Sequence, residues 1–382
     1  MQLVEFGSIM NMAKGKKPAN QSPEKRDGFM PYVDIKAFET NTVENYTDGV
    51  KCLPCNEGDI LIVCDGSRSG LVGKAINGYV GSTLAKITAD GMTQNYLYYF
   101  LQGKYALLNT KKKGTGTPHL NPDLLKKQML VVPSIPEQER IITRIEELFS
   151  ELDKAVKTLQ TTKQQLAVYR QAVLNEAFSN SESWPQYEFG KIMDVVRNGY
   201  GNKPADSGDY RILTIGSVRS LALDLCNYRL NNQPFDECDL IAENDLLFTR
   251  YNGSKEFVGV CAVVPKLKTE YAYPDKLIKF RPHIQDADYS KYLTYYSSSG
   301  IARKYLRSKI KTTSGQNGIA GTDIKKMTIH IPSMEVIHRI VFEIESRLSV
   351  CESIEQTVDT ALAQADAMRQ SILKQAFEGG YV

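Results

Sequence analysis

The side chains of this sequence that could do chemistry do not form a known catalytic motif. The close cysteine pair Cys52 and Cys55 has no second pair at zinc-binding spacing, and the four histidines form no HExxH pattern. The segment KKKGTGTPH, which begins at Lys111, lacks the Gly-Lys-Ser/Thr of a phosphate-binding loop. No GxSxG, GxGxxG or amino-methyltransferase tetrapeptide is present. We therefore expect no catalytic residue, no metal site and no cofactor in this chain.

Basic and polar residues cluster beside glycines instead, at matching places in the two halves of the chain. Lys and Arg in such loops suit phosphate contacts, where they displace counterions. In TRYNGSK, which begins at Thr249, Arg suits guanine edges and Asn suits adenine edges. For any single lysine a solvated charged surface is the better explanation, but recurrence of the clusters at equivalent places in both units favours binding to double-stranded DNA. The predicted DNA contacts are Lys14, Lys16, Lys17, Ser67, Arg68, Lys111, Lys112, Lys113, Arg197, Lys203, Arg250, Tyr251, Asn252, Ser254, Lys255, Arg303, Lys304 and Arg307.

The elements that carry these clusters are duplicated. When the sequence is shifted by 199 positions, the segments from Val132 and Ile331 align without a gap, and fifteen of forty-seven positions are identical. The preceding segments repeat with small changes of offset: EFGSIM becomes EFGKIM, and GDILIVCDG resembles NDLLFTRYNG. Each copy is therefore a globular unit that tolerates insertions, followed by a helix of fixed length.

The helical segments show heptads, which favour a coiled coil. In the first helix one predicted row is Ile141, Leu148, Ala155, Thr162 and Tyr169, and the other is Ile145, Leu152, Leu159, Leu166 and Val173. SIPE, from Ser134 to Glu137, has the form of a capping box and marks the helix start. We expect the two helices to pair with each other in antiparallel orientation, and packing of each helix into a domain core is the alternative.

The segments before the helices alternate short β-branched or aromatic runs with turn residues, and each unit also holds one helical stretch rich in tyrosine. The predicted fold class is α+β: two mixed α+β domains joined by two long antiparallel coiled-coil helices, with pseudo-two-fold internal repetition. The expected boundaries are 1–133 and 181–332 for the domains, and 134–180 and 333–382 for the helices.

Bulk composition narrows the class of protein. The 382 residues are 42% hydrophobic and 24% charged, with a formal net charge of +3. No window is apolar enough to span a bilayer, and the first ten residues lack the features of a signal peptide. These features favour a cytoplasmic protein that does not contact a membrane.

The duplicated EFGxIM and GDIL units, each followed by PSIPEQERI or a relative and then by RQxVLxxAF or RQxILxxAF, resemble the specificity subunit of Type I restriction-modification systems. The resemblance covers essentially the whole chain. It implies that each domain is a target recognition domain for half of a bipartite, asymmetric DNA site. It also implies two methyltransferase subunits that use S-adenosylmethionine, and motor-nuclease subunits that use ATP and Mg²⁺.

The resemblance also implies docking of methyltransferase subunits at the ends of the helices. The positions carried over are Glu137, Gln138, Arg140, Arg170, Gln171, Arg339, Arg369 and Gln370. The second copy has Glu335, Val336 and Ile337 in place of Pro, Glu and Gln, so the two ends are not expected to dock identically. Two other readings remain open: a recognition subunit of a different restriction or phage-defence system, and a coiled-coil scaffold that binds proteins and no DNA. An enzyme with an unrecognised site is a third.

Overall fold

The computed structural model describes residues 3–110, 118–201, 207–313 and 315–378. The chain divides into two compact units, residues 1–159 with 359–382 and residues 160–358. Each of the long helices α6 (Ile135–Ala177) and α10 (Met334–Glu378) is therefore divided between the two units. None of the described helices is long and apolar enough to cross a membrane.

The first unit is built on a four-stranded antiparallel sheet of order β2-β10-β7-β8, whose strands are Met10–Lys14, Leu84–Ala89, Ile60–Val63 and Val72–Lys74. The central strand β7 is buried along its whole length because its residues, ILIV, have no polar side chain. Short helices cover the sheet: α1 (Phe6–Ile9), α3 (Gln94–Gly103), α4 (Tyr105–Thr110) and α5 (Pro122–Lys126). Strands β1 (Leu3–Glu5) and β11 (Met129–Val131) pair separately.

The second unit repeats this topology strand for strand. Its sheet has the order β13-β21-β18-β20, with strands Met193–Asn198, Leu277–Pro282, Leu246–Thr249 and Cys261–Val263. The covering helices are η2 (Phe189–Ile192), α7 (Ala287–Ser298), α8 (Gly300–Ser308) and α9 (Gly321–Lys325). Strands β12 (Gln186–Glu188) and β24 (Thr328–His330) pair as β1 and β11 do. The predicted duplication and the mixed α+β class are confirmed.

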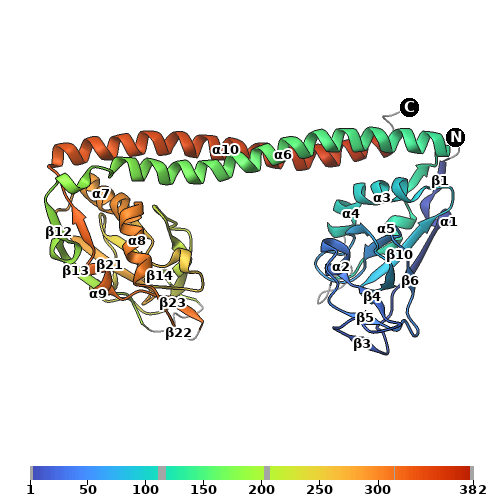
Figure 1. The fold of residues 1–382 in the computed structure, drawn as a ribbon, viewed down its shortest axis with the longest axis horizontal. Coiled ribbons are helices and arrows are strands. Elements are labelled where there is room, and N and C mark those ends of the chain that lie inside the picture. The colour runs from blue at the N-terminus through green and yellow to red at the C-terminus, as the bar shows by residue number, and fades with distance from the viewer. Residues whose placement is uncertain (1–2, 111–117, 202–206, 314, 379–382) are drawn as a thin grey trace. The chain divides into compact units, whose positions relative to one another are not determined.

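The two units differ in the segments inserted into this common framework. The first holds a second sheet of order β3-β5-β4-β9-β6, with strands Gln21–Ser22, Tyr46–Thr47, Met30–Val33, Gly78–Val80 and Pro54–Cys55, and helix α2 (Ile35–Thr40). The second holds pairs β14 (Tyr210–Leu213) with β17 (Tyr228–Asn231) and β15 (Val218–Arg219) with β16 (Ala222–Leu223). It also holds a three-stranded sheet, β19 (Tyr251–Asn252), β23 (Gln316–Gly318) and β22 (Lys311–Thr313). Figure 1 shows β3, β4 and β5 of the first unit, and β22 and β23 of the second, at the end of each unit away from the long helices.

The repeated GDIL and NDLL motifs have a structural cause. Asp59 accepts a hydrogen bond from the Asn56 backbone N–H at 2.8 Å, and Asp245 accepts the same bond from Ala242 at 2.8 Å. Each carboxylate also binds a cation from the neighbouring strand, Lys86 for Asp59 and Arg281 for Asp245. The aspartate thus closes the turn before the central strand in both units.

Helices α6 and α10 run antiparallel within each unit. In the second unit Arg170 of α6 pairs with Glu355 of α10 at 2.7 Å, and Glu176 of α6 pairs with Arg347 of α10 at 2.9 Å. The residue numbers increase along α6 and decrease along α10 between these two pairs, so the helices are antiparallel. In the first unit Asp153 pairs with Arg369. The predicted antiparallel pairing is confirmed in both units.

One of the two predicted heptad rows was correct and the other was wrong by one residue. The row from Ile145 to Val173 is buried or half-buried throughout, whereas Ala155 and Tyr169 of the other row are exposed. The true second row is Ile142, Phe149, Val156, Lys163 and Arg170. This row was missed because it contains charged residues, which the search for apolar heptads passes over. Arg170 occupies the seam through its ion pair with Glu355.

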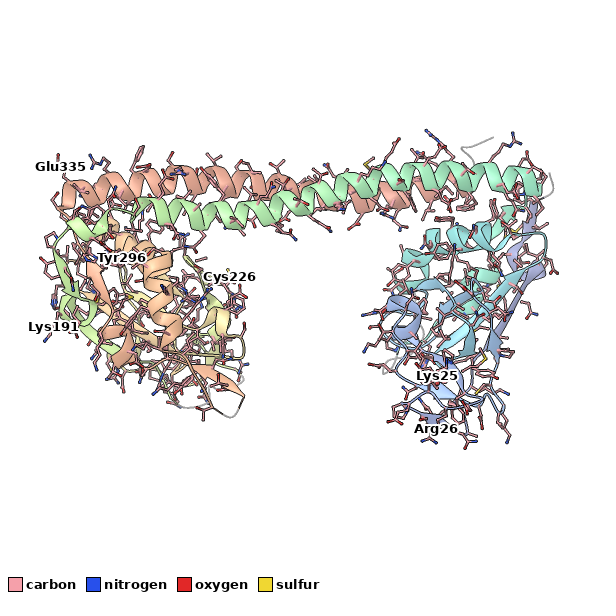
Figure 2. All side chains as sticks on the ribbon, viewed as in Figure 1. Lys25, Arg26, Lys191, Cys226, Tyr296 and Glu335 are labelled. Carbon is pink, nitrogen blue, oxygen red and sulfur yellow. The ribbon has the colours of Figure 1, made fainter. Side chains whose placement is uncertain are left out.

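The helices also pack into the domain cores, so the alternative to helix pairing holds in part. Phe178, just beyond the end of α6, is fully buried against Tyr292 and Tyr296 of α7, with ring centroids 5.5 and 5.1 Å away. Figure 2 shows Tyr296 between the body of the domain and the long helices. Phe377 of α10, 199 positions later, packs on Tyr96 and Phe100 of α3. The Ala-Phe ending of each repeat therefore anchors its helix in the domain of the other repeat.

Candidate nucleic-acid interface

The sheet of the first unit brings most of its predicted DNA contacts to one edge. Strands β2 and β7 both run antiparallel to β10, so their carboxyl ends lie together, with Lys14 opposite Ala85 and Val63 opposite Leu84. Lys14 is the last residue of β2, Lys16 and Lys17 follow it, and Ser67 and Arg68 follow β7; all five are exposed. Arg68 forms an ion pair with Glu39. Lys111, Lys112 and Lys113 lie outside the described residues.

A carboxylate lies at the centre of this edge. Asp65 accepts hydrogen bonds from Lys14 Nζ and from His119 Nδ1, each at 2.8 Å. Partial burial acts to raise the pKa of Asp65, but the bonds from Lys14 and His119 outweigh it and the pKa is lowered. Asp65 and His119 were not predicted from the sequence, although Asp65 lies in GDILIVCDG and His119 ends KKKGTGTPH. Their pairing orients Lys14 and leaves the edge net cationic.

An asparagine fixes the loop that carries Ser67 and Arg68. Asn109 of α4 donates from Nδ2 to the carbonyl oxygens of Ser67 and Ser69, both at 3.1 Å. The loop needs this support because it reverses direction at Gly66 and Gly70, whose φ angles are +107° and +93°. Asn109 was not predicted from the sequence, since its partners are backbone atoms 40 and 42 residues away.

The equivalent edge of the second unit is also cationic. Arg197 lies near the end of β13 and Arg250 directly after β18, and both strands pair with β21. The Arg250 guanidinium lies 4.7 Å from the centre of the Tyr251 ring, and Lys276 Nζ lies 5.5 Å from the same ring. Arg197 is 3.5 Å from Asp239. Lys203 lies outside the described residues.

The turn after β19 holds the remaining predicted contacts. Asn252 Oδ1 accepts from the Ser254 N–H at 3.0 Å, and Ser254 Oγ accepts from the Glu256 N–H at 3.4 Å. Lys255 is exposed. The sequence pattern did not connect this turn with the hairpin of β22 and β23, in which β23 pairs with β19 from more than sixty residues away.

The three basic residues predicted on α8 have different environments. Lys304 and Arg307 are exposed and line a cavity of about 1060 Å³ beside Arg170. Arg303 instead donates to the carbonyl oxygens of Glu256, Val258 and Gly259 at 2.6 to 3.2 Å. Burial lowers the pKa of Arg303 to about 10, which leaves it charged at neutral pH. Its guanidinium N–H groups hold the segment between β18 and β20. Arg303 therefore supports the fold and is not available for DNA contact.

The residues predicted to dock a partner at the start of α6 are also of two kinds. Glu137 accepts from Ser134 N and Oγ at 3.1 and 2.8 Å, which lowers the pKa of its carboxyl and satisfies part of the predicted capping box. Arg140 is exposed. Gln138 has no exposed surface: its amide donates to Gly91 and Pro133 and accepts from the Thr93 N–H. Ile337, at the same place in the second copy, is equally buried, so the substitution there replaces a bonded amide by an apolar side chain.

Two docking candidates at the other end of the helices are interhelical contacts. Arg170 and Arg369 occupy equivalent seam positions and pair with Glu355 and Asp153. Gln171 donates to Asn175 Oδ1 at 3.0 Å and to Ser298 O at 3.3 Å. Arg339 and Gln370 are exposed.

Within the described residues, Asp236, Cys238 and Asp239 come within 4.8 Å of one another. Asp239 already pairs with Arg197, and we assign no metal to this group.

A model of the Type I restriction modification DNA specificity domain matches residues 1–164 and 182–362. The chain is 34% identical over 288 residues to the Type I restriction enzyme EcoKI specificity subunit of Escherichia coli (strain K12), a match that covers 71% of this chain and 62% of that protein. It is 25% identical over 344 residues to the StySPI specificity subunit of Salmonella potsdam, covering 84% and 74%.

A solved structure that addresses complex assembly and conformational transition of the type I R-M system contains a similar chain. The TM-score is 0.71 at 16% identity, over 99% of this chain and 98% of that one. This likeness shows a shared fold for the two chains.

Proposed function

Because this chain belongs to the Type I restriction-modification DNA specificity family, we propose that it is the DNA-recognition subunit of such a system in the cytoplasm. One observation carries the proposal: the same four-stranded sheet occurs twice, and cations lie at the same edge of each copy, on the strand ends and on the glycine-containing loops beside them. Such loops suit phosphate contacts, and the polar side chains among them suit base edges. The chain itself is not an enzyme in this proposal.

Each unit recognises one half of a split DNA site. The inserted segments differ completely between the units, so the two half-sites differ in sequence and the whole site is asymmetric. Symmetric dimers, in contrast, bind palindromes. The helices α6 and α10, of 43 and 45 residues, set the number of unrecognised base pairs between the half-sites, because each is about 65 Å long.

Partner subunits supply the chemistry. Two methyltransferase subunits bring S-adenosylmethionine for adenine methylation, and motor-nuclease subunits bring ATP and Mg²⁺. The exposed Arg140, Arg339 and Gln370, with the half-buried Glu137, are the docking candidates that this structure leaves accessible. Gln138, Arg170, Gln171 and Arg369 support the docking region from within, through their intramolecular bonds.

The test is a genome-wide map of methylated adenine in cells with and without this gene. We expect a split motif with a fixed unrecognised spacer that disappears when the gene is deleted. Absence of any gene-dependent motif, with the partner methyltransferase shown to be expressed, would contradict the proposal. DNA binding by the assembled complex should also weaken steeply with salt, whereas a protein-binding scaffold shows no such dependence.

A further inference from the structure

We propose that in the second unit strands β22 and β23 form a two-stranded ribbon that enters the DNA major groove, where Gln316 contacts an adenine. Asn317 is the residue that positions this ribbon. The inference rests on the proposed function and deepens it, because it names one recognition element and the base that it selects.

The register of the small sheet decides which side chains share a face. Tyr251, Gly318 and Lys311 form one row across the three strands, and Asn252, Asn317 and Thr312 form the next. Thr313 and Gln316 form a third row. Since neighbouring rows point to opposite faces, Tyr251, Lys311, Thr313 and Gln316 share one face, and Asn317 points to the other.

Asn317 ties the ribbon to the rest of the unit. It is only 6% exposed, donates from Nδ2 to Gly253 O at 2.8 Å, and accepts from Thr312 Oγ1 at 2.7 Å. One side chain therefore links β22, β23 and the turn after β19. A buried amide with both ends bonded fixes local geometry more strongly than exposed contacts do.

The other face is polar and accessible. Lys311, Thr313 and Gln316 are exposed, and among the described residues none of these side chains bonds within the chain. Beside them lies the Tyr251 ring with Arg250 and Lys276. The ring can lie there because residue 318 is glycine: a Cβ at that position would come within 2.5 Å of the ring.

This arrangement matches the requirements of the major groove. The groove, about 12 Å wide, admits a two-stranded ribbon, and a glutamine amide can bond to adenine N6 and N7 together. Lys311 on the ribbon, and Arg250 and Lys276 beside it, supply cations for phosphate contacts. Gln316 has the side chain for base contact, and Thr313 beside it has only a hydroxyl and a methyl group.

The experiment maps adenine methylation by the complete complex carrying Gln316→Ala. We expect one base of one half-site to become degenerate, with discrimination there reduced roughly 5- to 150-fold, while the other half-site stays unchanged. Gln186→Ala, an exposed glutamine on β12 of the same unit, is the matched control and keeps the whole motif. Gln316→Arg should shift the preference at that base from adenine toward guanine, a gain that misfolding cannot produce.

For Asn317→Ala we expect loss of discrimination within the same half-site, with salt-dependent non-specific DNA affinity retained. A purely structural role would weaken both properties together. If wild type gives a split motif and Gln316→Ala and Gln316→Arg leave every position of it intact, this inference is wrong and the proposed function stands. If wild type gives no motif, both are wrong.

Discussion

Asp65 is a carboxylate at the centre of a cationic edge, where it holds Lys14 and His119. Burial opposes its ionisation, but these hydrogen bonds lower its pKa below that of an unfolded chain. The unfolded state therefore binds the proton more readily than the folded state does. Ionised Asp65 thus stabilises the fold above about pH 4, and this stabilisation is lost as the pH falls further. Because the Lys14 and His119 side chains are about half exposed, we expect these contacts to add less than about 1 kcal/mol to the free energy of unfolding.

The free energy of unfolding should thus fall more steeply below about pH 4 in wild type than in Asp65→Asn. Urea unfolding of both proteins across that range measures the difference. Equal slopes would show that the Asp65 contacts are absent in solution.

Arg303 and Arg307 lie one helical turn apart on α8, yet we expect opposite phenotypes. Arg303→Ala leaves three backbone carbonyls without their donor and should destabilise the protein by about 2 to 4 kcal/mol. Arg307→Ala should leave stability unchanged and reduce the salt dependence of DNA binding by about one counterion. Thermal unfolding and DNA titrations of the assembled complex at several salt concentrations measure both. A destabilised Arg307→Ala with an unchanged salt slope would contradict this assignment.

At the scale of elements, the helix ends depend on aromatic anchors. Phe178 is fully buried in a cluster with Tyr292 and Tyr296, so Phe178→Ala should cost about 3 to 5 kcal/mol. Phe377 is only partly buried, so its replacement by alanine should cost less. Chemical unfolding of the two variants tests the order. An equal or reversed order would show that the two anchors do not differ as their burial indicates.

The sequence was sufficient to predict elements whose pattern is local and repeated. Heptads and a shared offset predicted both long helices and their antiparallel pairing, and β-branched runs predicted the central strands β7 and β18. The seam containing Arg170 was missed because charged residues interrupt its apolar pattern, and the residue that explains Arg170 there, Glu355, is 185 residues away. The contributions of Asn109 and Asn317 were missed for the same reason, since each binds backbone atoms of a distant segment. Arg303 resembled a free cation because nothing local reveals its carbonyl partners.

At the scale of the whole molecule, the proposed spacer function can be tested by lengthening both helices. Seven residues inserted at equivalent positions of α6 and α10 add one heptad, which keeps the seam intact and adds about 10 Å. At about 3.4 Å per base pair, the unrecognised spacer should grow by about three base pairs while both half-sites stay the same. Adenine methylation mapping measures the spacer. An unchanged spacer in a complex that still methylates would show that the helices do not set it.

The two helical segments align with each other without insertions or deletions, whereas the two domain segments align only with changes of offset. This difference has a consequence for the gene. One extra codon within Ile135–Ala177 turns every following residue of the helix by about 100°, which moves Arg170 away from Glu355 and Phe178 out of its aromatic cluster. The same codon placed in a loop of the domain inserts displaces no buried row. Changes of length can therefore accumulate in the loops of the domain inserts, whereas the helix-coding segments should change length only in multiples of seven codons.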